Sequence, residues 1–196
     1  MGCLISVTLA YFIGSLSFAI IISKLMHALD PRMVGSGNAG ATNILRLVGK
    51  QAAIYVLLAD GLKGLIAVLI GRLFHVHGMN LAFVGLITVI GHIFPIYFSF
   101  KGGKGVATMT GALFGLSFWV GLFSILVWFT VAYFTRYSSV ATLVLTIAAP
   151  VFMVISTHID YFFPVLIMVT FIIWKHWENI QRLCQRTERK IDFGKR

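Results

Sequence analysis

The sequence predicts an all-α, polytopic membrane protein with seven transmembrane helices, on the basis of its composition, its apolar runs and its basic residues. Of 196 residues, 59% are hydrophobic and only 11% are charged, and the mean hydropathy is +0.93. Soluble domains carry about 25% charged residues, so this composition excludes a soluble enzyme. The 17 Phe and 4 Trp exclude an intrinsically disordered chain. We expect residues 1–196 to form a single transmembrane domain.

Apolar runs long enough to cross about 30 Å of hydrocarbon give the expected helices in order. They cover residues 4–23, 51–73, 80–98, 106–135, 140–157 and 161–174. The run 106–135 holds no charged residue and could be one long tilted helix or two short helices that turn near residues 117–119. Two helices of about 15 residues would each reach only about 22 Å, so neighbouring helices would have to shelter them.

The basic residues decide between these alternatives. The chain carries 16 Lys and Arg against 6 Asp and Glu, a formal charge of +10. Two helices in 106–135 give seven spans, with the N-terminus outside and the C-terminus in the cytoplasm. Of the 16 basic residues, 14 then lie on the inner side, with Arg72 outside and Lys63 within a span. A single long helix would place the basic tail opposite the first loop, against the positive-inside rule.

The first inner loop contains the motif GSGNAGATNILR at residues 35–46. Glycines allow backbone conformations in which successive N–H groups converge on an anion, and short polar side chains add donors. The candidate substrate-binding residues are Gly35, Ser36, Gly37, Asn38, Gly40, Thr42 and Asn43. Arg46 adds a guanidinium that suits phosphate or carboxylate. The alternative is a flexible loop of turn residues, but the density of donors beside an Arg favours an anion site.

The second inner loop reads KGGKGVAT at residues 101–108 and leads into the helix expected from residue 106. Glycines before a helix N-terminus, flanked by lysines, combine backbone N–H groups, helix dipole and point charge. The candidate residues are Lys101, Gly102, Gly103, Lys104, Gly105 and Thr108. The motif is not a Walker A loop, because Gly105 follows Lys104 where Ser or Thr is required. A basic loop that serves only topology would need the lysines but not three glycines.

Further polar residues are expected at the same face. Arg136 and Ser139 lie in a short inner loop. His176, Asn179 and Arg182 recur every three residues, so they share one helical face if the last span continues inward. The alternative for His176 is an interfacial residue without a catalytic role.

Polar residues elsewhere have a structural interpretation. Asp60 and Lys63 lie three residues apart in the second span, where we expect a mutual ion pair that braces the bundle. His92 could orient the chain as it enters the second glycine loop. The His75 and His77 pair lacks carboxylate or Cys support, so neither a metal site nor a cofactor is expected.

Two anion-binding loops on one face indicate two anionic substrates, one of them with an apolar tail held among the helices. This geometry favours a transferase that acts on a lipid precursor. A small multi-span anion transporter is the alternative, although a transporter would place its cationic residues near the bilayer midplane on broken helices.

In this order, the motifs resemble those of the bacterial PlsY family of acyl-phosphate:glycerol-3-phosphate acyltransferases. The matching segments are GSGN-x-GATN-x-x-R at 35–46, GH-x-x-P at 91–95, FKGGKGVAT at 100–108, R-Y-x-S at 136–139 and H-x-x-N-I-x-R-L at 176–183. The resemblance covers the whole chain and also implies seven spans with an outer N-terminus. One departure lies in the tail: the family usually has Gly two residues before a Glu, and this chain has Arg186 before Glu188. The geometry of that turn is therefore open.

The resemblance implies transfer of a fatty acyl group from acyl phosphate to the sn-1 hydroxyl of glycerol 3-phosphate, giving lysophosphatidic acid and phosphate in the first step of phospholipid synthesis. It assigns glycerol 3-phosphate and the alignment of its hydroxyl to Ser36, Arg46, Lys104, Ser139, His176 and Asn179, and acyl phosphate to the Gly102–Gly105 loop. Membrane lipids and the enzyme that supplies acyl phosphate are the expected partners, and nucleic acid is not. The expected location is the bacterial inner membrane, with the site facing the cytoplasm.

Acyl phosphate already carries a good leaving group, so no covalent intermediate is required. Arg46 and Lys104 would screen the two phosphates from each other. The hydroxyl proton has two candidate acceptors: His176, near its ordinary pKa of about 6.5, or the donor phosphate itself. We favour the phosphate, because no carboxylate is spaced to orient His176. None of the 6 His starts an H-x-x-x-x-D pair, the dyad typical of acyl-CoA-dependent acyltransferases.

Overall fold

The computed structural model describes residues 1–156 and 159–191, and within these ranges it contains helices and no strand. This confirms the all-α prediction. The elements are α1 (Gly2–Gly14), α2 (Phe18–Leu25), α3 (Ala41–Leu47), α4 (Lys50–Leu73), α5 (Gly78–Ile93), η1 (Ile96–Phe98), α6 (Val106–Leu116), α7 (Phe118–Thr135), α8 (Ser138–Ile155), η2 (Ile159–Tyr161), α9 (Phe162–Lys175) and α10 (Trp177–Cys184).

Four helical segments are long and apolar enough to cross a membrane individually, namely α4, α5 with η1, α7 and α8. The pairs α1–α2 and α9–α10 pass the same test as bent pairs, with bends of 40° and 55°, so the described residues hold between four and six candidate spans. The boundaries of α4, α8 and α9 lie within about two residues of the predicted ones. Helix α5 ends at Ile93, five residues before the predicted end, and the 3-10 turn η1 continues to Phe98. Helix α6 has 11 residues and reaches only about 16 Å.

The first span differs from the unbroken helix expected over residues 4–23. Helix α1 ends at Gly14, and α2 begins at Phe18. In the gap, the Leu16 carbonyl accepts a hydrogen bond from Lys63 Nζ at 2.5 Å, which satisfies a backbone group that lipid could not. Gly14 also packs directly on α5, where an added Cβ would lie 2.2 Å from the Thr88 carbonyl oxygen. Both partners are distant in sequence, so the contacts that hold the break cannot be deduced from the run itself, although Gly14, Ser15 and Ser17 lie at the break.

The charge-free run 106–135 forms two helices that separate at Ser117, as the basic residues predict. Arg72, near the end of α4, closes the C-terminal end of α6. Its Nε donates to the carbonyl of Gly115 and its Nη2 to that of Leu116, both at 3.0 Å. The last carbonyls of a helix receive no hydrogen bond from their own helix, and Arg72 supplies the missing donors. A short α6 is therefore compatible with a water-poor environment.

Helix α6 is buried against α4 through very close backbone contacts. A Cβ on Gly111 would lie 1.8 Å from the Gly61 carbonyl oxygen, and a Cβ on Gly64 would lie 2.1 Å from that of Thr108. Small residues at such contacts let membrane helices pack by van der Waals attraction. The surrounding core comes mainly from α4, α5, α6, α8 and α9, with Met109 of α6 fully buried.

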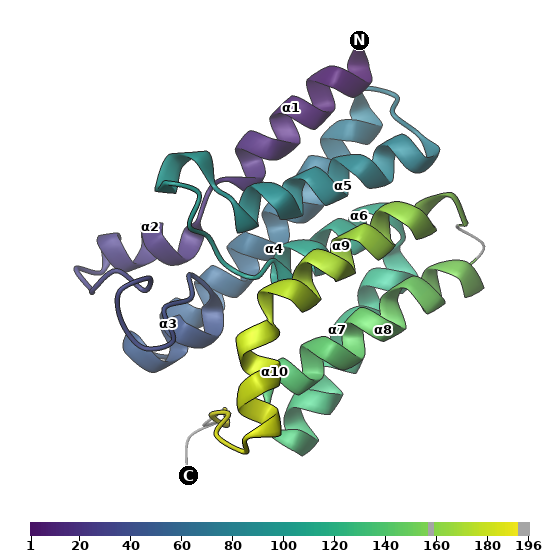
Figure 1. Cartoon of the computed structure of the whole chain (residues 1–196). Helices are drawn as coiled ribbons and strands as arrows, with labels where there is room; N and C mark the ends of the chain where they lie inside the picture. Colours follow the sequence, from purple (N-terminus) through teal and green to yellow (C-terminus); the bar gives the residue numbers. More distant parts are fainter. Residues whose placement is uncertain (157–158, 192–196) are drawn as a thin grey trace.

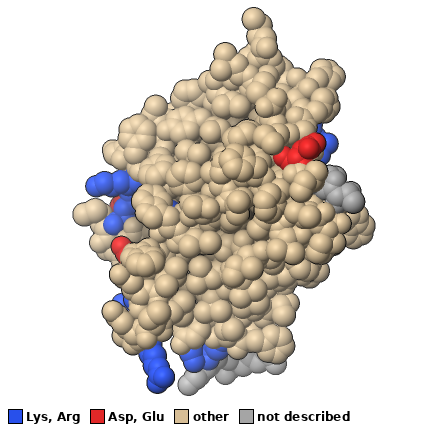
Figure 2. Space-filling model, turned by 45° about the vertical axis from the view of Figure 1, so that its right-hand side comes forward, with Lys and Arg blue, Asp and Glu red and all other residues tan. Residues whose placement is uncertain are grey.

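The glycine loops and the C-terminal helix lie at one end of the bundle (Figure 1). Helices α2 and α3 are at the left of that view, and α10 turns away from α9 toward the lower left. Helix α9 is apolar and α10 is polar on average, so the apolar part of this bent pair ends next to His176. Figure 2 shows Lys and Arg side chains along the left and lower edges of one face, beside a broad surface without charged side chains. Such a surface suits contact with lipid.

Gly111→Ala should lower the stability of the protein by about 1–3 kcal/mol, because the new methyl group must push α6 away from α4. Gly61→Ala is the matched control at the same contact, since its Cβ would meet the Ala107 carbonyl oxygen at an ordinary 3.7 Å. Thermal unfolding in detergent measures both. Equal unfolding temperatures for the two variants would contradict the close contact.

Candidate active site

Asn43, on α3, holds the first glycine loop in shape from within. Its Oδ1 accepts the N–H of Ser36 at 3.0 Å, and its Nδ2 donates to the carbonyls of Pro31 at 2.8 Å and Val34 at 3.1 Å. The residue is 1% exposed. Both ends of the Asn43 amide are therefore used by the loop itself, and a direct contact with substrate stays a prediction.

Glycine is required at two positions of this loop. Gly35 and Gly37 both have φ of +68°, in the left-handed region. A Cβ on Gly35 would also lie 2.3 Å from Asn43 Oδ1. Gly40 then caps α3 in an extended conformation, with the Asn38 amide beside it. The turn leaves Ser36 exposed at the surface of the loop.

The second glycine loop lies flat on the end of α5. The N–H of Gly102 donates to the Ile93 carbonyl at 3.2 Å, and that of Gly103 donates to the His92 carbonyl at 3.3 Å. These two amides donate within the protein, so they cannot bind the anion that was expected across the whole loop. The donors that remain for an anion are Lys104 and the N–H groups of the first turn of α6, which have no acceptor within their own helix.

The two glycine loops meet at Gly103. A Cβ there would lie 2.3 Å from His92 Nε2 and 2.5 Å from the carbonyl oxygen of Ala39 in the first loop. Gly105, with φ of +87°, then caps the start of α6. The chain can pass between α5 and the first loop only because residue 103 has no side chain.

A polar cluster joins the second loop to α8 and the tail, and it consists of Lys104, Ser139, Asn179, Arg182 and Glu188. Lys104 Nζ donates to Asn179 Oδ1, and Asn179 Nδ2 donates to Glu188 Oε1 at 2.6 Å. Ser139 Oγ donates to the same Oε1 at 2.8 Å, and Arg182 Nε donates to Oε2 at 2.8 Å. The Glu188 carboxylate thus brings together residues of two predicted motifs, 136–139 and 176–183, and Asn179 links them to Lys104 of a third.

Glu188 is the residue of this cluster that sequence reasoning missed. Its only signal was its place in the tail motif, and nothing there points to Ser139, 49 residues earlier. Burial alone would raise the pKa of Glu188, but hydrogen bonds from Arg182, Asn179 and Ser139 outweigh burial and hold that pKa below its ordinary value. The charged carboxylate therefore orients the Ser139 and Asn179 side chains.

The turn that returns Glu188 to the site closes α10 as a Schellman motif. The N–H of Thr187 donates to the Arg182 carbonyl at 2.8 Å, and that of Arg186 donates to the Leu183 carbonyl at 3.1 Å. Arg186 has φ of +58°, a conformation that favours glycine. The departure from the family's Gly thus leaves the turn intact, at a conformational cost of about 1 kcal/mol.

His176 lies between α9 and α10, and its ring is buried, at 4% exposure. Its Nδ1 lies 2.8 Å from the Ile172 carbonyl oxygen, and since a carbonyl only accepts, Nδ1 carries the proton and Nε2 is an acceptor. Burial lowers the pKa of His176 to about 4, with a further contribution from the charge of Lys104. This corrects the expected pKa near 6.5 and makes the ring neutral at physiological pH. Burial likewise lowers the pKa of Lys104 to about 8, assisted by the charge of Arg182.

The tail crosses the same end of the molecule and contacts two predicted basic residues. Arg46 Nη2 donates to the Arg189 carbonyl at 3.4 Å. The N–H of Ile191 donates to the Arg136 carbonyl at 2.6 Å, and the Arg136 guanidinium donates back to the Ile191 carbonyl at 3.3 and 3.4 Å. Arg136 thus holds the tail in place, and its contact with substrate stays a prediction.

Three other predicted residues lie outside the polar cluster. Thr42 Oγ1 is 3.4 Å from Ser138 Oγ and links the first loop to α8. Lys101 is exposed on the second loop. Thr108 is fully buried on α6, with its hydroxyl covered and its carbonyl against Gly64. The substrate-binding roles of these three residues also stay predictions.

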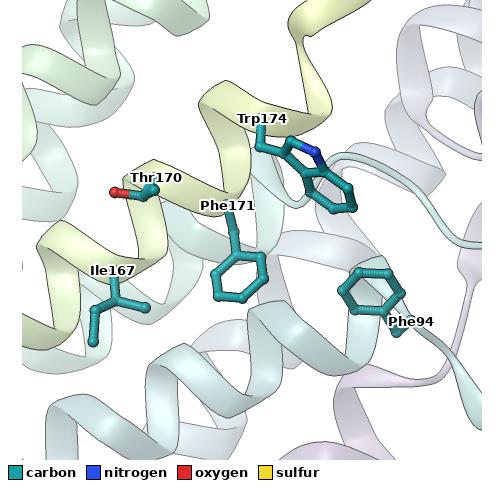
Figure 3. A pocket seen from close by; sticks show the side chains of 5 residues that line it. All are labelled: Phe94, Ile167, Thr170, Phe171 and Trp174. Atoms are coloured by element: carbon teal, nitrogen blue, oxygen red, sulfur yellow. The ribbon is translucent and has the colours of Figure 1, made fainter.

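An open apolar groove of about 420 Å³ lies beside the site, between the end of α5 and α9 (Figure 3). It is lined by Phe94, Ile167, Thr170, Phe171 and Trp174. The rings of Phe94 and Trp174 approach to 6.1 Å between centroids. Phe94 and Trp174 lie where α5 and α9 end, so the groove lies at the ends of these helices that lead to the second glycine loop and to His176. An apolar chain in the groove and a charged group near Lys104 could therefore belong to one ligand.

The sequence matches the family model described as "Glycerol-3-phosphate acyltransferase" over residues 4–186. A glycerol-3-phosphate acyltransferase of Coxiella burnetii is 61% identical over 191 residues, which cover 97% of this chain and 99% of the relative. One from Francisella tularensis is 45% identical over 182 residues, covering 93% of this chain and 89% of the relative.

The fold is similar to that in two crystal structures of PlsY, described as an integral membrane glycerol 3-phosphate acyltransferase. The glycerol 3-phosphate form has a TM-score of 0.93 and 41% identity, and the lysophosphatidic acid form has a TM-score of 0.90 and 40% identity. In both comparisons the match covers 98% of this chain and 96% of the other.

The helical spans and the polar cluster at one end define an integral membrane enzyme. The chain belongs to the glycerol-3-phosphate acyltransferase family and has the PlsY fold, so it is an acyltransferase. This finding confirms the predicted family and the choice of an enzyme over a transporter.

Arg186→Gly should raise the stability of the protein by about 0.5–1 kcal/mol, because glycine adopts the left-handed conformation of residue 186 without strain. Arg186→Ala removes the same charge but keeps the Cβ, so it should give no such gain. Thermal unfolding in detergent compares the two, and kcat/KM should be unchanged in both. A lower unfolding temperature for the Gly variant than for the Ala variant would contradict the assigned turn.

Proposed function

We propose that this acyltransferase moves a fatty acyl group from acyl phosphate to the sn-1 hydroxyl of glycerol 3-phosphate, giving lysophosphatidic acid and inorganic phosphate in the first step of phospholipid synthesis. The observation that carries the proposal is the polar cluster around Lys104 and Glu188, next to the neutral imidazole of His176. The glycerol 3-phosphate and lysophosphatidic acid forms of PlsY, at 41% and 40% identity, support this acceptor and this product.

The proposal includes seven spans in the bacterial inner membrane, with the N-terminus outside and the site facing the cytoplasm. Helix α6 would be the seventh span, a short one sheltered by α4 and closed by Arg72. The basic residues of the glycine loops and tail support this orientation through the positive-inside rule. The site takes residues from α3, the second loop, α8 and α10, which supports one domain over residues 1–196.

Glycerol 3-phosphate would be bound by Ser36, Arg46, Lys104, Ser139, His176 and Asn179. Arg46 and Lys104 supply the positive charge, and the glycine loop around Ser36 supplies backbone donors. Because Glu188 already orients Ser139 and Asn179, these groups need little reorganisation when substrate arrives. His176 Nε2 then accepts the hydrogen bond of the hydroxyl that reacts.

Acyl phosphate would place its phosphate between Lys104 and the first turn of α6, and its chain in the groove of Phe94, Phe171 and Trp174. The position of the groove at the ends of α5 and α9, where the chain continues into the second glycine loop and to His176, supports this placement. The enzyme that makes acyl phosphate would deliver it from the same side of the membrane.

In the reaction, the hydroxyl oxygen attacks the acyl carbonyl carbon, and the bond between that carbon and the phosphate oxygen breaks. We assign the hydroxyl proton to the donor phosphate. His176 is too weak a base for this task at neutral pH, because burial lowers its pKa to about 4. Its part is to orient the hydroxyl through Nε2, while Ile172 holds Nδ1.

His176→Ala should therefore retain slow turnover with a raised KM for glycerol 3-phosphate. Since the ring of His176 is neutral above pH 4, the wild-type rate should lose nothing to protonation of His176 until the pH falls toward 4. Steady-state kinetics from pH 5 to 8 measure both effects, with His75→Ala as a control in a loop at the far end of α4. Loss of all turnover at saturating substrate would instead identify His176 as the base.

The donor is tested with purified protein in detergent, glycerol 3-phosphate and either palmitoyl phosphate or palmitoyl-CoA. We expect lysophosphatidic acid with palmitoyl phosphate as the donor and none with palmitoyl-CoA. Product from palmitoyl-CoA without acyl phosphate would refute the proposed donor. Transport of glycerol 3-phosphate into liposomes without any product would refute the reaction.

A further inference from the structure

Three buried side chains form an intramembrane cluster between α4 and α5, separate from the polar cluster: Asp60 and Lys63, each 2% exposed, and His92, 4% exposed. Lys63 Nζ lies 2.8 Å from Asp60 Oδ1 and 2.8 Å from His92 Nδ1, and it also donates to the Leu16 carbonyl at 2.5 Å. Charged side chains are costly within a membrane span, so their presence there points to a function.

The structure confirms the predicted ion pair of Asp60 with Lys63, and both side chains also contact His92 of α5. Both residues belong to α4. The contact also lacks the angles of a hydrogen bond, because Asp60 Oδ1 has no hydrogen-bond partner among the described residues. Asp60 Oδ1 lies 3.5 Å from His92 Nδ1 without a hydrogen bond, whereas the Lys63 ammonium hydrogen-bonds to both Leu16 and His92. Asp60 therefore serves to stabilise and aim that ammonium.

The ammonium fixes the state of the His92 ring. An ammonium only donates, so Nδ1 accepts and the ring proton lies on Nε2. The Nε2 edge faces the second glycine loop, where a Cβ on Gly103 would lie 2.3 Å from Nε2 and 3.0 Å from Cε1. The His92 carbonyl meanwhile accepts the N–H of Gly103. Ring and carbonyl together support the residue that directly precedes Lys104.

We propose that Asp60 and Lys63 are positioning residues for the acyl transfer. They fix the position of His92, on which Gly103 of the second glycine loop packs, and so place the Lys104 ammonium against Asn179. A misplacement of about 1 Å can cost on the order of 100-fold in rate, and the space at Gly103 is too small for a methyl group. The inference rests on the proposed role of Lys104 in binding phosphate.

The first test compares two neutral replacements of the ion pair. Asp60→Asn with Lys63→Gln keeps an N–H donor toward His92, whereas Asp60→Asn with Lys63→Met has similar length and no donor. Both avoid an unpaired buried charge, which favours folding. For glycerol 3-phosphate, we expect kcat/KM of the double variant with Lys63→Gln (the Gln pair) to lie within about threefold of wild type. We expect kcat/KM of the double variant with Lys63→Met (the Met pair) to be at least about tenfold below wild type. Equal kinetics of the two pairs would overturn the proposal.

The second test is a double-mutant cycle with Lys104→Gln, read by turnover and, independently, by binding of radiolabelled glycerol 3-phosphate. If Lys63 acts through Lys104, the tenfold loss of the Met pair should shrink to less than about threefold when Lys104 is already replaced. An undiminished loss would mean a general structural role and would overturn the proposal. Wild-type activity of Lys104→Gln alone would instead refute the proposed role of Lys104, which is a separate failure.

Thr88→Val is the matched control for a buried polar group on the same helix. Thr88 lies one turn before His92, is fully buried and donates only to the Val84 carbonyl of its own helix at 2.8 Å. Its replacement should leave kcat/KM unchanged. Thermal unfolding of every variant in detergent confirms that rates are compared on folded protein. A tenfold loss in Thr88→Val would show that any buried polar change in α5 disturbs the reaction, and the proposal would fall.

Discussion

The active site depends on the crossing at Gly103, where the two glycine loops and α5 meet without room for a side chain. The Ala39 carbonyl and the His92 ring both lie in the space that a Cβ would take. Lys104 follows this contact directly, and the loop of Ala39 leads into α3 with Arg46. One close contact thus sets the separation of the two cations that the proposed reaction needs. Close-packed contacts of this kind transmit displacement, because no empty space can absorb it.

The bilayer explains why two cations in or near the spans bind backbone carbonyls. Helix breaks at residues 15–17 and at Ser117 leave carbonyl groups that lipid cannot satisfy. Lys63 fills this role at the first break and Arg72 at the second. Lys63 does so while it also contacts His92, so the same residue connects the bend of the first span to the residue on which the second glycine loop packs.

Local pattern was enough to predict the helical class, the ends of most spans and the two glycine loops, and the distribution of basic residues along the chain predicted the break near Ser117. It could not predict the break after Gly14, because the partner of Leu16 is a lysine 47 residues away. It also missed Glu188, whose importance arises only when the Arg186 turn folds the tail back onto Ser139. The expected pKa of His176, near 6.5, was wrong because it took no account of burial, which depends on how the whole chain folds. Long-range contacts, not local propensity, supply what was missed.

The central claim is that one end of the bundle holds both phosphorylated substrates around Lys104, with the reacting hydroxyl at His176. A structure with glycerol 3-phosphate and a non-transferable acyl phosphonate bound together tests it most directly. The account predicts that the phosphate of glycerol 3-phosphate and the phosphonate both contact the Lys104 ammonium. It also predicts that the sn-1 hydroxyl donates to His176 Nε2 and that the alkyl chain lies between Phe94 and Trp174. A glycerol 3-phosphate bound away from Lys104, or an acyl chain on another face of the bundle, would contradict it.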